Sequence, residues 1–129
     1  MSAQPTEIKL HQQSRILEIT FSDGICYQLP SEFLRVYSPS ADVSGHGPGQ
    51  EVLQVGKKEV GITAIVPVGS YAVQIDFDDG HGSGLYTWEY LYKLAKYQPA
   101  LWRDYLERVA SAGASREPLP GSKRSANNT

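Results

Sequence analysis

The sequence predicts an α+β fold, in which small antiparallel β-sheets with short helices come first and two helices form the C-terminal end. Before residue 78, apolar and polar residues alternate in several short runs, as in half-buried strands. After residue 87, apolar residues recur every three or four positions, as in amphipathic helices. The chain of 129 residues, 40% hydrophobic and 20% charged, has the size and composition of one globular domain.

The first predicted sheet is a small antiparallel meander. Alternation predicts strands at residues 7–11 and 15–21. The dipeptide Asp23-Gly24 is a strong hairpin signal, because glycine readily takes the positive φ that the tight turn needs. Residues 25–29 are therefore expected to return as a third strand, with Cys26 as a buried or half-buried thiol.

The middle of the chain continues with one short helix and more strands. A helix is expected from Pro30 to Ser38, because Pro39 cannot continue it. Residues 51–55 are expected to be extended. Runs rich in β-branched residues then predict strands at 59–66 and 71–77.

Two helices are expected to complete the fold. Thr87 is a candidate N-cap for a helix over residues 88–97, and Pro99 suits the first turn of the next helix. Gly113 is a natural stop for that second helix. We therefore expect a flexible N-terminus over 1–6, the folded domain over 7–112 and a disordered tail over 113–129.

Charge and cysteine content narrow the classes of function. A net charge of −2 gives no basic footprint for nucleic acid. The single cysteine permits neither an internal disulfide nor a cysteine-based zinc site. No segment resembles a secretory signal or a membrane span, so we expect a cytoplasmic protein without membrane association.

Two glycine-rich loops, at residues 34–50 and 78–84, carry the candidate functional residues. Each loop places a histidine between glycines, and carboxylates lie nearby in the sequence. Imidazole and carboxylate together suit a divalent ion such as iron or zinc. The candidate metal ligands are His46, His81, Asp42 and Asp79. The alternative is that both histidines only make structural hydrogen bonds within their loops.

Other interpretations of these loops remain open. Glycines at three alternate positions could form a backbone nest for an anion. The candidate binding residues of the first loop are Ser38, Ser40, Gly45, Gly47 and Gly49. No nucleophile elbow accompanies the loop serines, so the sequence favours a non-enzymatic protein. Helical spacing cannot bury Tyr86, Tyr90 and Tyr97 on the same face as the other aromatic residues after position 85, so some of these three rings are expected at the surface, where they could contact an unidentified protein partner.

With these residues in view, the chain resembles the gamma-butyrobetaine hydroxylase-like N-terminal domain family, over residues 8–94. The motifs that carry the resemblance are Phe21-Ser22-Asp23-Gly24, Leu34 to Val43, Gly45 to Gln50, Pro67 to Ala72 and Phe77 to His81. The resemblance implies a small bacterial stand-alone domain of unknown function.

The family's other settings bear on the metal hypothesis. In carnitine-synthesis oxygenases, a similar domain binds structural zinc through three cysteines and a histidine. Their positions fall on Ser38, Ser40, Val43 and His81, so only the histidine is present in this chain. We also expect no catalytic oxygenase domain, so the resemblance does not imply hydroxylase activity. Relatives appended to P-loop iron–sulfur carriers imply a role near iron–sulfur assembly. We therefore expect a non-enzymatic accessory module that binds iron or zinc, or alternatively a metal-free protein adaptor.

Overall fold

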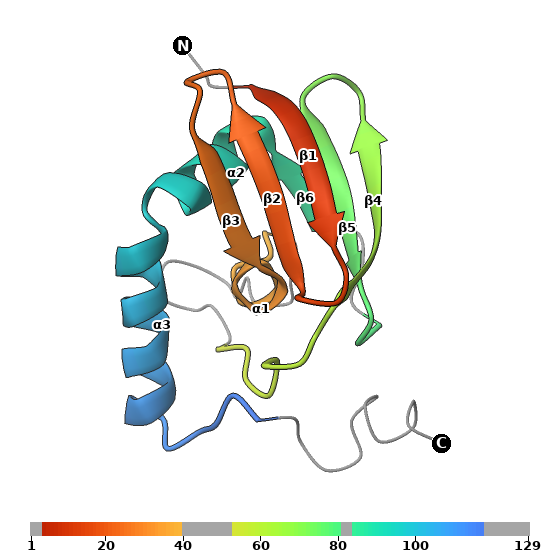
Figure 1. Ribbon diagram of the computed structural model, residues 1–129. Helices are drawn as coiled ribbons and strands as arrows, with labels where there is room; N and C mark the ends of the chain where they lie inside the picture. The colour runs from red at the N-terminus through yellow and green to blue at the C-terminus, as the bar shows by residue number, and fades with distance from the viewer. Residues whose placement is uncertain (1–3, 40–52, 81–83, 118–129) are drawn as a thin grey trace.

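The computed structural model describes residues 4–39, 53–80 and 84–117. It confirms the α+β class. Two three-stranded antiparallel sheets have the orders β1-β2-β3 and β4-β5-β6. Figure 1 shows the sheets stacked face to face, with α1 at one end and α3 standing alongside.

The first sheet follows the predicted meander closely. Its strands are β1 (Pro5–His11), β2 (Ile16–Phe21) and β3 (Cys26–Pro30). The β2–β3 turn has Gly24 at φ 83°, and Asp23 Oδ1 accepts a hydrogen bond of 2.9 Å from the Ile25 amide. One expectation is wrong: the Cys26 side chain is exposed, because it begins β3 on the outer face.

The second sheet differs more from the sequence prediction. Its strands are β4 (Ile62–Val68), β5 (Ala72–Phe77) and β6 (Gly84–Thr87). The strand predicted to begin at residue 59 begins later, because Val60 is held in a turn by a 3.0 Å bond from its amide to the Lys57 carbonyl. The sequence analysis did not predict β6, since this short edge strand begins with Gly84 directly after a glycine-rich segment. Residues 53–55, expected to be extended, form no strand, and residues 51 and 52 lie outside the described ranges.

Three helices complete the described structure. They are α1 (Ser31–Val36), α2 (Trp88–Lys96) and α3 (Gln98–Ser111). Thr87 caps α2 as predicted, since its hydroxyl accepts a 3.1 Å bond from the Tyr90 amide. Gly113 ends α3 at φ 65°, and bonds from residues 113 and 114 to the carbonyls of 110 and 109 form a Schellman motif.

The core lies between the two sheets and is closed by the helices. Its fully buried members include Ile19 and Phe21 from the first sheet, Ile75 from the second, Phe33 from α1 and Leu91 from α2. Burial of these side chains is the main favourable contribution to folding. None of the three described helices is long and apolar enough to cross a membrane.

The chain after α3 turns back onto the domain. We call residues 114–117 the C-terminal strap. The carbonyls of Ser115 and Arg116 accept bonds of 3.0 and 2.9 Å from the amides of Gly56 and Lys58. The first residues of the expected disordered tail are therefore hydrogen-bonded to the domain, while 118–129 lie outside the described part of the chain.

Candidate functional site

Two of the predicted site residues fall within the described structure. Ser38 follows α1, and Asp79 lies in the turn after β5. The remaining predicted residues lie outside the described ranges, so the structure does not test whether the two glycine loops meet. They are Asp42, His46 and His81 of the metal hypothesis, and Ser40, Gly45, Gly47 and Gly49 of the binding hypothesis.

Asp79 lies between two cationic side chains. Its Oδ2 atom accepts a hydrogen bond of 2.9 Å from Nε of Arg35, in the last turn of α1, and one of 2.6 Å from Nζ of Lys57. The side chains of Arg35, Asp79 and Lys57 are only 7%, 11% and 22% exposed. We call these three residues the cationic centre, because two positive charges share one carboxylate in a mostly buried place.

Arg35 has donor capacity that the described residues do not use. Its Nη1 atom is buried and has no hydrogen-bond acceptor within residues 4–39, 53–80 and 84–117. A guanidinium carries five N–H donors in a fixed planar fork, and a buried donor without an acceptor costs roughly 1–3 kcal/mol. The cationic centre therefore holds an unsatisfied donor and a net positive charge.

The two cations beside Asp79 oppose its predicted role as a metal ligand. A divalent cation at Asp79 would meet the charges of Arg35 and Lys57 at contact distance, which opposes its binding. Asp79 is thus positioned as a partner for cations of the chain itself. Within the described residues, no group of three or more His, Cys, Asp or Glu side chains is arranged to hold a metal ion.

Ser38 is buried and hydrogen-bonded to the core of the domain. It is 3% exposed, and its hydroxyl hydrogen-bonds with the hydroxyl of Tyr86. Tyr86 is fully buried and donates a 2.6 Å bond to the carbonyl of Leu34, near the end of α1. Burial raises the pKa of Tyr86 above its ordinary value, so this donor keeps its proton.

Tyr90 supports the same helix end. Its hydroxyl donates to the Tyr37 carbonyl, and burial raises its pKa to about 12. Of the aromatic residues expected at the surface, only Tyr97 is largely exposed, at 53%. Tyr86 and Tyr90 instead fix the carbonyls that end α1, and so fix the backbone that carries Arg35.

Sequence reasoning did not select Arg35 or Lys57. The two residues lie 44 and 22 positions before Asp79. Arg35 belongs to the Leu34 to Val43 motif, but nothing in that motif pairs it with Asp79. Arg35 stands inside the first predicted loop region, but a short helix offers no periodicity that distinguishes a buried cation from a solvated one.

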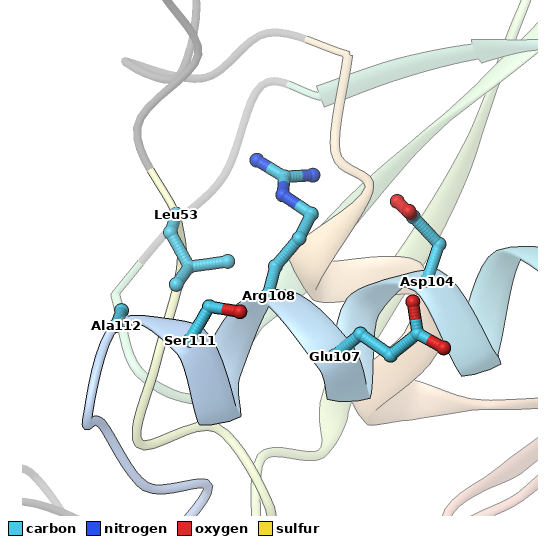
Figure 2. A pocket seen from close by; sticks show the side chains of 6 residues that line it. All are labelled: Leu53, Asp104, Glu107, Arg108, Ser111 and Ala112. Carbon is cyan, nitrogen blue, oxygen red and sulfur yellow. The ribbon is translucent and has the colours of Figure 1, made fainter.

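A separate hollow of about 440 Å³ lies along the last turns of α3. Figure 2 shows Arg108 extending from the helix on the same side as Asp104, with Leu53 across the hollow. The α3 side chains that line it are exposed, and acids accompany the arginine. The cationic centre, with its buried donor, is therefore the stronger candidate for binding.

Comparisons with known proteins agree on the kind of domain. The sequence model described as "Gamma-butyrobetaine hydroxylase-like, N-terminal" matches residues 8–92. One solution NMR structure is 50% identical, with a TM-score of 0.81, covering 94% of this chain and 95% of that one. A second is 54% identical, with a TM-score of 0.78, covering 92% and 88%.

A crystal structure of a protein from Acidithiobacillus ferrooxidans is also similar to this chain. It is 40% identical over 71% of this chain and 92% of that chain, with a TM-score of 0.60. Its protein is described as one of unknown function in the DUF971 family. The comparison with curated proteins gives no match.

Proposed function

This chain belongs to the gamma-butyrobetaine hydroxylase-like N-terminal family, and we propose that it is a non-enzymatic accessory module whose cationic centre binds an anionic group of a partner protein. The observation that carries the proposal is the buried Nη1 atom of Arg35, which lacks an acceptor among the described residues. The proposal takes up the metal-free adaptor interpretation of the sequence.

The chemistry of the centre favours a carboxylate or a phosphate. Either group offers oxygen acceptors that match the planar guanidinium fork, and charge-assisted bonds of this kind are about twice as strong as neutral ones. The Nε atom of Arg35 already binds Asp79, so the incoming group would bind through the remaining side of the fork. Lys57, 22% exposed, would supply the second positive charge.

The unsatisfied donor of the centre supports a binding role over a purely structural one. A network that only stabilised the fold would be expected to satisfy its buried donors, since an orphaned donor costs stability. An unsatisfied donor beside a net positive charge instead suits a site that a ligand completes.

A divalent metal ion is the second candidate ligand. Glycine-framed histidines favour it, with His46 and His81 as the ligands and Asp42 assisting. Asp79 is left out of this candidate, because it already binds two cations of the chain. A role of this chain in iron–sulfur assembly, by contrast, is implied only by the family resemblance.

The test is a titration of the full chain with inorganic phosphate and with acetate, against chloride at matched ionic strength. Binding is followed by amide NMR shifts and by the melting temperature. Arg35→Lys keeps the charge and removes the fork, so it should lose most of the response. Lys57→Ala should weaken binding, whereas Lys58→Ala should not, because Lys58 pairs with Glu117 at the surface.

The outcomes separate the candidates. Saturable binding of phosphate or acetate that depends on Arg35 and Lys57 supports the proposal. A response that is identical in Lys57→Ala and Lys58→Ala would refute it. No response to anions, together with near-stoichiometric iron or zinc lost on replacing His46 and His81, would favour the metal candidate.

A further inference from the structure

The C-terminal strap inserts an arginine against a buried carboxylate. Arg116 binds Glu32 through two parallel bonds of 2.8 Å, from Nε to Oε2 and from Nη2 to Oε1. The Glu32 side chain is 7% exposed, while that of Arg116 is 35% exposed. A buried acid in the first turn of α1 is therefore neutralised by a cation that comes from the end of the folded chain.

An aromatic platform completes the contact. The guanidinium carbon of Arg116 lies 5.2 Å from the centroid of the Trp102 ring, within the range of a cation–π interaction. Trp102 is itself held by Tyr105, stacked at 5.2 Å, and by the edge of Phe33 at 6.2 Å. The carboxylate and the ring thus belong to α1 and α3, not to the strap that delivers the arginine.

The strap itself is held by few contacts outside this pair. Two backbone bonds join it to Gly56 and Lys58, and Lys58 Nζ also binds Glu117 at 2.9 Å. Both side chains of that ion pair are well exposed, and such pairs contribute little. Arg116 is therefore the main side-chain anchor that the described structure gives the strap.

A pocket opens beside the anchor. Its volume is about 380 Å³, within the range of ligand pockets, and most of its surface is apolar. The lining residues are Pro30, Glu32, Gln98, Pro99, Trp102 and Arg116. A longer segment bearing an arginine would find apolar surface here next to the carboxylate and the ring.

We propose that Glu32 and Trp102 form a binding site for an arginine side chain, which Arg116 fills within the chain and which an arginine-bearing segment of a partner protein fills in its place. Charge complementarity selects a cation, and the bidentate geometry and the ring select arginine over lysine, because lysine has neither the planar fork nor the flat face. The site is distinct from the cationic centre and does not depend on the anion proposal.

The experiment compares binding of two blocked peptides, acetyl-Gly-Arg-Gly-amide and acetyl-Gly-Lys-Gly-amide, to the full chain and its variants. The readout is the indole N–H signal of Trp102, assigned with Trp102→Phe. Arg116→Ala empties the site, and Glu32→Gln/Arg116→Ala also removes the carboxylate charge. If Arg116→Ala folds poorly, its melting temperature is measured with added methylguanidinium, and with methylammonium as the matched control. Recovery by methylguanidinium alone would show that the site binds a guanidinium group.

We expect Arg116→Ala to bind the arginine peptide and not the lysine peptide. The unaltered chain should bind it at least about tenfold more weakly, because a tethered competitor has a high effective concentration. The double variant should not bind. Equal binding by the unaltered chain and Arg116→Ala, equal binding of both peptides, or no binding or recovery of Arg116→Ala would overturn the proposal.

Discussion

Replacing Asp79 by asparagine tests the anion interpretation of the cationic centre against the sequence prediction that Asp79 is a metal ligand. The asparagine side chain would keep the shape of the aspartate but lose the charge that Arg35 and Lys57 share. Breaking a buried ion pair by removing one partner typically costs about 3–5 kcal/mol. Because an amide oxygen still accepts one bond and Lys57 is partly exposed, we expect a loss of about 2–4 kcal/mol in the free energy of unfolding.

The same substitution should strengthen anion binding. For an anion about 5 Å from Asp79, loss of one negative charge is worth roughly 1–3 kcal/mol at effective dielectric constants between 80 and 20. That corresponds to roughly a five- to 150-fold gain in affinity. If Asp79 were instead a metal ligand, the substitution would weaken metal binding and give the anion no advantage.

Urea unfolding and phosphate titration of the folded protein measure the two effects separately. Asp76→Asn is the matched control, because it also removes one negative charge, from β5. The Asp76 carboxylate accepts a hydrogen bond from Gln74 and is not part of the cationic centre. The control should leave phosphate affinity nearly unchanged. An Asp79→Asn protein that is destabilised but binds phosphate no more tightly than Asp76→Asn would refute the electrostatic reasoning.

Three further predictions concern the rest of the structure. Tyr86→Phe should lower the free energy of unfolding by about 1–2 kcal/mol, because it orphans the Leu34 carbonyl; an unchanged urea midpoint would contradict this. Arg116→Ala should cost about 2–4 kcal/mol, since it leaves Glu32 buried and unpaired, whereas loss of the exposed Glu117 should cost under about 1 kcal/mol in the same assay. Stability should fall as the pH rises from about 10 to about 12, because the folded protein keeps phenolic protons that the unfolded chain loses; an absorbance titration of all tyrosines near pH 10 would exclude this. The residues with pKa values raised to about 12 are Tyr90, Tyr92 and Tyr105.

Local chemistry made much of the fold predictable. The Asp23-Gly24 turn, the Thr87 cap and the Gly113 stop each depend on a few neighbouring residues, and the structure has all three. Alternation also located most strands to within a few residues. It failed for β6, because four residues beginning with glycine hold too little pattern to separate a strand from a loop.

The candidate site was less predictable because it is built from long-range contacts. Asp79 was selected as a metal ligand from its residue type, yet its charged partners come from α1 and from the connection before β4. Nothing in the sequence near Asp79 indicates these partners. The burial of Tyr86 could not be predicted either. Its hydroxyl donates to the Leu34 carbonyl near the end of α1, and helical spacing does not indicate this contact.

The short helix α1 links the two proposed binding sites. Glu32 and Arg35 are three positions apart on it, one facing the strap and the other the cationic centre. The backbone bonds of the strap also flank Lys57, at Gly56 and Lys58. Changes at one site should therefore be measured at the other before a variant is interpreted.

The measurement that tests the central claim most directly is an NMR titration of the Arg35 side-chain Nε–H signal with inorganic phosphate, assigned by its loss in Arg35→Lys. We expect a saturable shift that is weaker in Lys57→Ala and stronger in Asp79→Asn. An Arg35 signal that does not respond to phosphate or acetate at matched ionic strength, but does respond to Zn²⁺ or Fe²⁺, would contradict an anion site and favour a metal module.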